Sequence, residues 1–209
     1  MIQSCKICGI SDPKTLDYII NHRCPPHFIG FIVNYKKSPR YVEYEKLEKL
    51  IDVDKKEINF VAVLVEPNKN ILEKIKKLNF DYYQLYNVTP QQTKLIKEKY
   101  KKKIISAITI KNKKDVIKYK EFESISDIIL FDSKGYEKSI GFDHELLNEV
   151  PNTITKMVGG NIKIDMNFSK LKEKVKIIDI SGALESEKGL KDLKKIDIFL
   201  ENINKHYEK

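Results

Sequence analysis

The chain has 209 residues and a formal net charge of +9, which comes almost wholly from lysine because Arg23 and Arg40 are the only arginines. A chain of this length can bury one substantial core, so we expect residues 1–209 to form a single domain. Glutamates lie among the lysines, which favours solvated helix faces over a nucleic-acid site. No apolar run approaches the ~18 residues of a membrane helix, and no export signal is present. We therefore expect a cytoplasmic protein with reduced cysteines that binds neither membranes nor nucleic acid.

Short runs of β-branched and aromatic residues alternate with longer amphipathic segments along the chain. The short runs predict strands at 4–8, 28–33, 60–65, 82–85, 104–108, 128–131, 154–157 and 177–180. The longer segments predict helices at 15–21, 44–50, 70–78, 90–100, 114–119, 143–148, 162–171 and 190–204. This alternation favours a (β/α)8 TIM barrel over an open doubly wound sheet, and no G-x-G-x-x-G follows the first strand. In such a barrel the site lies at the carboxyl ends of the strands.

Cys8 closes the first predicted strand, and Gly9 after it allows a sharp turn that leaves the thiol open towards the barrel mouth. The thiol could be a base or a nucleophile, but a free cysteine is more often a buried, inert side chain. A redox pair with Cys5 is disfavoured, because side chains three residues apart in a strand point to opposite faces.

A zinc site is a second alternative for this region. Cys5, Cys8, His22 and His27 have the spacing C-x2-C-x13-H-x4-H, which falls within a permissive zinc-finger pattern. A finger of this kind places both histidines on one helix, whereas the segment 23–26 between them contains consecutive prolines that would break it. We therefore expect no metal site here.

Later strands also end in residues suited to chemistry. Asp132 follows the apolar run 128–131, where buried apolar surface could raise the pKa of its carboxyl group and make it a general acid. A capping aspartate is the other interpretation. Barrels often bind phosphate through backbone N–H groups after the seventh and eighth strands. The small residues at these two places are Gly159, Gly160, Ser181, Gly182 and Ala183.

Fragments spread over the whole chain resemble motifs of the phosphoribosylanthranilate isomerases, in the order and spacing of that family. They are 6–10 (KICGI), 30–32 (GFI), 37–41 (KSPRY), 84–85 (QL), 130–134 (LFDSK), 142–143 (FD), 159–161 (GGN), 179–185 (DISGALE) and 188–192 (KGLKD). The resemblance implies a TIM-barrel enzyme of tryptophan biosynthesis. Such an enzyme rearranges N-(5-phosphoribosyl)anthranilate to an open-chain carboxyphenylamino-deoxyribulose phosphate, without a metal or an organic cofactor.

The resemblance also implies a role for each candidate residue. Asp132 would protonate the ribose ring oxygen, and Cys8 as a thiolate would remove the C2 proton. Arg40 would pair with the anthranilate carboxylate, Gln84 would contact the substrate, and the small residues after the seventh and eighth strands would bind its phosphate. Lys6 is not expected to provide directly the positive charge that a thiolate needs, and its role stays open.

The chain departs from the usual family pattern in four places, one of which, Gly182-Ala183 in place of a serine-glycine pair, still permits backbone N–H donation. Tyr86-Asn87 stand where histidine and glycine are common, and His144 stands where tryptophan is common. Residues 136–141 replace a glycine-rich loop, so we expect a less flexible loop over the site. The alternative function is a TIM-barrel protein that acts on or binds another phosphorylated sugar metabolite. We expect a monomer or a homodimer, and the sequence does not decide between them.

Overall fold

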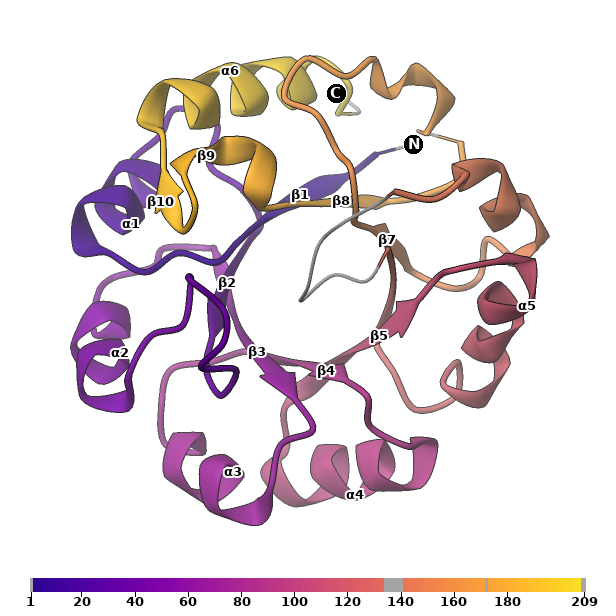
Figure 1. Cartoon of the computed structure of the whole chain (residues 1–209), viewed down its shortest axis with the longest axis horizontal. Helices are drawn as coiled ribbons and strands as arrows, with labels where there is room; N and C mark the ends of the chain where they lie inside the picture. Colours follow the sequence, from indigo (N-terminus) through magenta and orange to yellow (C-terminus); the bar gives the residue numbers. More distant parts are fainter. Residues whose placement is uncertain (1, 134–140, 172, 208–209) are drawn as a thin grey trace.

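The computed structural model describes residues 2–133, 141–171 and 173–207, which contain a closed barrel of eight parallel strands in chain order (Figure 1). The strands are β1 (Ser4–Cys8), β2 (Phe28–Ile32), β3 (Asn59–Val65), β4 (Tyr82–Tyr86), β5 (Lys103–Thr109), β6 (Ile128–Asp132), β7 (Lys156–Val158) and β8 (Ile177–Ile180). Because β1 pairs with both β2 and β8, the sheet closes on itself. The predicted (β/α)8 barrel is confirmed.

Helical segments surround the barrel (Figure 1). The α-helices are α1 (Pro13–Ile20), α2 (Tyr44–Ile51), α3 (Lys69–Ile75), α4 (Pro90–Tyr100), α5 (Lys113–Val116) and α6 (Leu193–Asn204). The 3-10 helices are η1 (Ile117–Glu121), η2 (His144–Glu149), η3 (Phe168–Lys170) and η4 (Gly182–Leu184). A hairpin of β9 (Glu185–Glu187) and β10 (Leu190–Lys191) lies between η4 and α6. None of the helices in the described ranges is long and apolar enough to cross a membrane.

The predicted helices agree best with the structure in the first half of the chain. The helix predicted at 162–171 is wrong, because this segment contains only the short η3. Its apolar residues Ile162, Ile164, Met166 and Phe168 recur at every second position, a spacing that does not suit a helix. The segment 114–119 is α-helical only as far as residue 116 and has 3-10 geometry from 117, and the segment 143–148 is a 3-10 helix from 144.

The last helix starts later than predicted, at Leu193 instead of residue 190. Leu190 and Lys191 pair with β9, and the Asp192 side chain then caps α6 by accepting from the backbone N–H groups of Lys194 and Lys195. This late start creates the hairpin that brings Lys191 to the barrel mouth.

Side chains of the strands alternate between two apolar cores. One core lies between the sheet and the helices and includes Cys5. The other fills the barrel interior and includes Cys8 and Met157. Cys5 and Cys8 therefore point to opposite faces of β1, as predicted, and cannot form a redox pair or ligate one ion together.

Candidate active site

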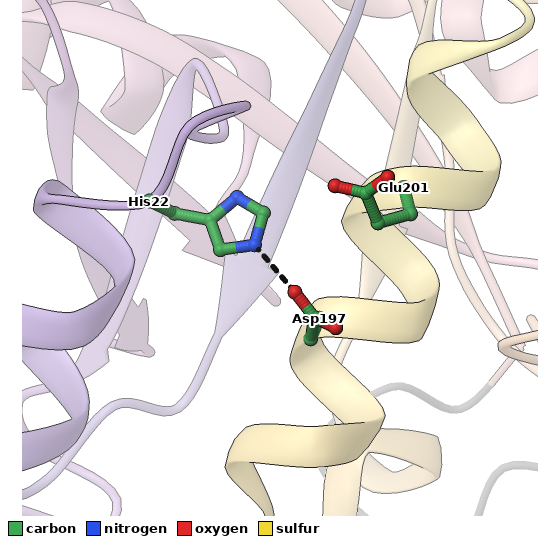
Figure 2. Close-up of side chains that lie close together, drawn as sticks. All are labelled: His22, Asp197 and Glu201. Carbon is green, nitrogen blue, oxygen red and sulfur yellow. Dashed lines mark hydrogen bonds and ion pairs between the residues drawn. The ribbon is translucent and has the colours of Figure 1, made fainter.

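A polar cluster outside the barrel mouth contains His22, Asp197 and Glu201, whose candidate ligand atoms lie within 4.8 Å of one another (Figure 2). The backbone N–H of Cys24 donates to His22 Nδ1 at 3.0 Å, so the proton of the neutral ring is on Nε2, which donates to Asp197 at 3.0 Å. Glu201 pairs with the guanidinium of Arg23. A metal ion would have to displace the Nε2 proton and compete with Arg23, so this geometry favours a hydrogen-bonded network over a metal site.

The predicted acid and base meet at one end of the barrel interior. Cys8, Tyr86 and Asp132 are the last residues of β1, β4 and β6, and their exposed fractions are 7%, 4% and 5%. The Tyr86 hydroxyl donates to Asp132 Oδ2 at 2.8 Å. Burial raises the pKa of the Tyr86 phenol well above its usual value, and the charges of Asp132, Asp179 and Cys8 add to this rise. The phenol therefore lies near both the acid and the base.

Asp132 lies where a carboxyl group can stay partly protonated near neutral pH. Burial raises its pKa to about 6, the charge of Asp179 adds to the rise, and the hydrogen bond from Tyr86 opposes it. Gly159 leaves space beside the carboxyl group, since a Cβ at that position would lie 3.2 Å from Asp132 Oδ1. A carboxyl group with this pKa is suited to general acid catalysis.

At the Cys8 sulfur, burial and positive charge have opposite effects. Burial raises the pKa of the thiol, and the charge of Asp179 adds to the rise, whereas Lys6 and Lys191 lower it. The Ser181 hydroxyl donates to the Cys8 carbonyl oxygen at 2.8 Å, which ties the ends of β1 and β8 together.

Lys6, whose role the sequence left open, lies on the same interior face of β1 as Cys8, and its charge lowers the pKa of the thiol against the effect of burial. Its ammonium is buried and pairs with Asp179 Oδ1 at 2.9 Å. A Cβ at Gly30 on β2 would lie 2.9 Å from Cys8 Sγ and 3.2 Å from Lys6 Nζ, so both atoms lie against this glycine. Lys6 and Cys8 occupy successive interior positions of β1, and the lysine side chain is long enough to extend from its own position towards the next. The two-residue period of a strand does not reveal this reach.

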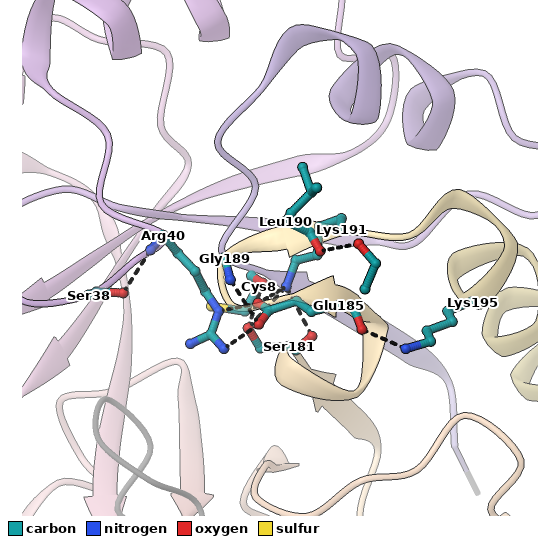
Figure 3. A network of polar contacts seen from close by, with 10 residues as sticks. Cys8, Ser38, Arg40, Ser181, Glu185, Gly189, Leu190, Lys191 and Lys195 are labelled. Carbon is teal, nitrogen blue, oxygen red and sulfur yellow. Dashed lines mark hydrogen bonds and ion pairs between the residues drawn. The ribbon is translucent and has the colours of Figure 1, made fainter.

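Arg40 reaches from the loop after β2 across Gly9, where a Cβ would collide with the arginine side chain. Its guanidinium pairs with Glu185 through two contacts, from Nε to Oε1 and from Nη2 to Oε2 at 3.0 Å (Figure 3). A Cβ at Gly182 would lie 3.4 Å from Arg40 Nη2. Arg40 therefore lies at the predicted rim, but with a carboxylate partner that the sequence prediction missed.

Lys191 extends this network towards β8 (Figure 3). Its ammonium lies 3.1 Å from Glu185 Oε1 and donates to the Ser181 carbonyl oxygen at 3.0 Å. The Lys191 side chain is 1% exposed, and burial lowers the pKa of its ammonium to about 8. Sequence reasoning missed the part that Glu185 and Lys191 have in this network. The available signal was that the fragments 179–185 and 188–192, which contain them, resemble family motifs.

Gln84 lies inside the barrel beneath Tyr86 and is fully buried. Its Nε2 donates to the Tyr86 hydroxyl at 3.2 Å. Tyr86, a departure from the family pattern, thus connects Gln84 to Asp132. The signal for this contact was the position of Tyr86 at a strand end, where an inward hydroxyl can reach across the barrel interior to β6, two strands away.

The residues predicted to bind phosphate follow β7 and β8 as expected. Gly160 has φ +80°, and a Cβ there would collide with Ser133. Gly182 and Ala183 open η4, and the first amide groups of a helical turn have no partner within it. Since Gly159 borders Asp132 and Gly182 borders Arg40, the two loops flank the acid and the Arg40 network.

The loop 136–141 departs from the family pattern, and its residues 136–140 lie outside the described residues. Lys134, the last residue of the fragment 130–134, also lies outside them. His144, another departure, is half-buried at the start of η2, and its ring meets that of Phe142 edge-on with centroids 4.9 Å apart.

These features define a TIM-barrel enzyme suited to acid–base chemistry on an anionic substrate, because a carboxyl group, a thiol and cationic side chains share the barrel mouth. Residues 5–202 match the family described as N-(5'phosphoribosyl)anthranilate (PRA) isomerase. The chain therefore belongs to the N-(5'-phosphoribosyl)anthranilate isomerase family.

Individual relatives agree with this assignment. The N-(5'-phosphoribosyl)anthranilate isomerase of Agrobacterium fabrum (strain C58) is 31% identical over 95% of this chain and 94% of its own length. The crystal structure of phosphoribosyl anthranilate isomerase from Thermotoga maritima covers 98% of this chain and 100% of its own, with TM-score 0.84 and 22% identity. A phosphoribosyl anthranilate isomerase in complex with reduced 1-(O-carboxyphenylamino)-1-deoxyribulose 5-phosphate has the same coverage, with TM-score 0.82 and 21% identity.

Proposed function

We propose that the chain catalyses the Amadori rearrangement of N-(5-phosphoribosyl)anthranilate to 1-(2-carboxyphenylamino)-1-deoxyribulose 5-phosphate, with Asp132 as general acid and Cys8 as general base. The observation that carries these roles is the placement of Cys8 and Asp132 as the buried last residues of β1 and β6, with the Tyr86 hydroxyl donating to Asp132 at 2.8 Å. Acid and base can therefore reach one substrate from the ends of β6 and β1. Membership of the isomerase family supports the identity of that substrate.

The reaction delivers one proton and removes another. Asp132 gives its proton to the ribose ring oxygen as the C1–O bond breaks, which leaves a protonated Schiff base between C1 and the anthranilate nitrogen. Cys8 as thiolate removes the C2 proton, the C–H electrons form the C1–C2 double bond of an enolamine, and the C=N electrons return to nitrogen. The enolamine gains a proton at C1 and loses the proton of its 2-hydroxyl group to give the ketone. No net oxidation or reduction occurs.

We propose that Arg40 binds the anthranilate carboxylate. A guanidinium group has five N–H donors, and Glu185 accepts from Nε and Nη2, so donors remain for a second carboxylate. The substrate phosphate would bind to backbone N–H groups of the loops after β7 and β8. These loops contain Gly159, Gly160, Ser181, Gly182 and Ala183. For Gln84 we propose an indirect contribution to substrate binding, through Tyr86.

Replacing Arg40 with alanine should raise KM by about 10- to 100-fold with a smaller change in kcat, because a charge-assisted contact to a group remote from the reacting carbons is made before and during the reaction. Steady-state kinetics check this expectation. Arg23→Ala is the matched control, since the other arginine pairs with Glu201 away from the barrel mouth and should leave KM unchanged. An unchanged KM in Arg40→Ala contradicts carboxylate binding at this position.

The pH dependence of kcat/KM should be bell-shaped, with its lower break at about pH 6. The pKa of Asp132 is raised to about 6, and burial raises the pKa of Cys8 above its ordinary value. The reactive form of the enzyme has Asp132 protonated and Cys8 ionised. Between the two pKa values this form is a small and constant fraction of the free enzyme, because the fraction of protonated Asp132 falls with rising pH as fast as the fraction of ionised Cys8 rises. Below the lower pKa, Asp132 is already protonated, so kcat/KM falls with pH as less Cys8 is ionised. A profile from about pH 5 to about pH 10 without a break near pH 6 contradicts the assignment.

Complementation of a bacterial strain that lacks this isomerase tests substrate and reaction together. The chain should restore growth without tryptophan, and the Cys8→Ala/Asp132→Asn double variant at the same cellular level should not. Failure of the original chain to restore growth, together with no conversion of phosphoribosylanthranilate by the purified protein, would favour a barrel protein acting on another phosphorylated sugar metabolite.

We also propose a cytoplasmic, single-domain enzyme that is a monomer or a homodimer. The place of the family in tryptophan biosynthesis supports the cytoplasmic location. Cell fractionation tests the location, and light scattering of the purified protein tests the oligomeric state. A single cooperative unfolding transition is expected for one domain.

A further inference from the structure

The barrel interior contains a charged pair that the proposed proton transfers leave unused. Lys6 on β1 is fully buried, Asp179 on β8 is 9% exposed, and Lys6 Nζ lies 2.9 Å from Asp179 Oδ1. Branched apolar side chains usually fill this space in TIM barrels, and the desolvation of a buried ion pair often cancels its attraction. Stability alone is therefore a weak reason for the pair, and its position beneath the Cys8 thiol suggests a part in the chemistry.

Gly30 on β2 shows how close the ammonium and the sulfur lie. A Cβ at this position would lie 2.9 Å from Cys8 Sγ, 3.0 Å from Lys6 Cε and 3.2 Å from Lys6 Nζ. A larger residue would force one of these side chains to move. The absence of a side chain at Gly30 thus leaves room for the lysine to extend towards the sulfur, where its positive charge favours the ionised thiol.

Other titratable groups also face the thiol within the described part of the chain. They are Arg40 from the loop after β2, Tyr86 from β4, Asp179 from β8 and Lys191 from β10. Arg40 and Lys191 both pair with Glu185, which offsets their positive charge. Lys6 lowers the pKa of the thiol more than Lys191 does.

We propose that Lys6 is a positioning residue for the base: its ammonium stabilises the thiolate of Cys8, and Asp179 holds that ammonium beneath the sulfur. The inference rests on the proposed role of Cys8 as the base. Asp179 then has two opposing effects, since it orients the ammonium while its own negative charge disfavours a thiolate nearby. Removal of Lys6 should therefore lower the fraction of Cys8 that is ionised, whereas removal of the Asp179 charge should leave that fraction unchanged or raise it.

The test compares Lys6→Met with the matched variant Asp179→Asn, using the rate at which iodoacetamide alkylates Cys8 near neutral pH. The mass of the Cys8 peptide separates this thiol from Cys5 and Cys24. We expect Lys6→Met to slow alkylation about tenfold or more and Asp179→Asn to leave it unchanged or faster, because only the thiolate reacts. The basic limb of kcat/KM should also move to higher pH in Lys6→Met.

A purely structural ion pair predicts a different result. Both substitutions would then break the pair and change alkylation in the same direction, and that outcome overturns the proposal. Lys191→Met is a second control, since it removes another buried ammonium near Cys8 and should have the smaller effect. If Lys6→Met does not unfold cooperatively, Lys6→Gln takes its place in the comparison. Alkylation of Cys8 in that variant as fast as in the original chain refutes the inference.

Alkylation needs no substrate, so this test is independent of the proposed function. Full activity of Cys8→Ala would refute Cys8 as the base even if Lys6→Met slows alkylation. Equal alkylation in Lys6→Met and the original chain would refute the role of Lys6 and leave the base assignment intact.

Discussion

Replacing Cys8 with alanine should lower kcat by roughly 10²- to 10⁴-fold with little change in KM, which is the usual contribution of a positioned general base. Alanine offers no group that can take the C2 proton, whereas Asp132 can still open the ribose ring. In Cys8→Ala the slow step should therefore be removal of the C2 proton, which follows ring opening. Steady-state rates and single-turnover loss of the ring-closed substrate measure the two steps separately.

Cys24→Ala is the control for this variant, because Cys24 is a partly exposed cysteine on the segment before β2 and should leave kcat unchanged. Both variants should keep the same cooperative unfolding transition, since the loss of one sulfur atom at the barrel mouth removes little packing. Near-normal kcat in Cys8→Ala would show that another group removes the proton.

The barrel could be predicted from the sequence because its strands are local patterns. Runs such as 60–65 and 128–131 are apolar, β-branched and bounded by polar turns, so their type does not depend on distant contacts. The segment 162–171 shows the limit of this reasoning. It packs its apolar residues against the core without forming a regular helix, and only the tertiary structure decides that outcome.

The site was predictable where a residue type and a strand end coincide, as for Cys8 and Asp132. The partners of these residues were not predictable, because they come from distant parts of the chain. Arg40 and Glu185 are 145 positions apart, and Lys6 and Asp179 are 173 apart. Each of these contacts depends on closure of the barrel between β1 and β8, which no local pattern encodes.

Asp132→Asn should lower kcat by roughly 10²- to 10⁴-fold, because an amide cannot give a proton to the ribose ring oxygen. Asparagine has nearly the same shape, and its carbonyl oxygen can still accept the hydrogen bond that Tyr86 donates to the carboxylate. The substitution therefore removes the acid with little change in geometry. Steady-state kinetics over a range of pH measure the effect.

The pH profile of this variant distinguishes loss of the acid from general damage. In the original chain the break near pH 6 belongs to Asp132, whose pKa is about 6. Without that carboxyl group, the residual rate should rise steadily through pH 6 as Cys8 ionises, since protonated acid no longer limits the reactive fraction. Asp52→Asn, which changes an exposed aspartate after α2, should keep both the rate and the break. If Asp132→Asn retains a break near pH 6, another group titrates there and Asp132 is not the acid.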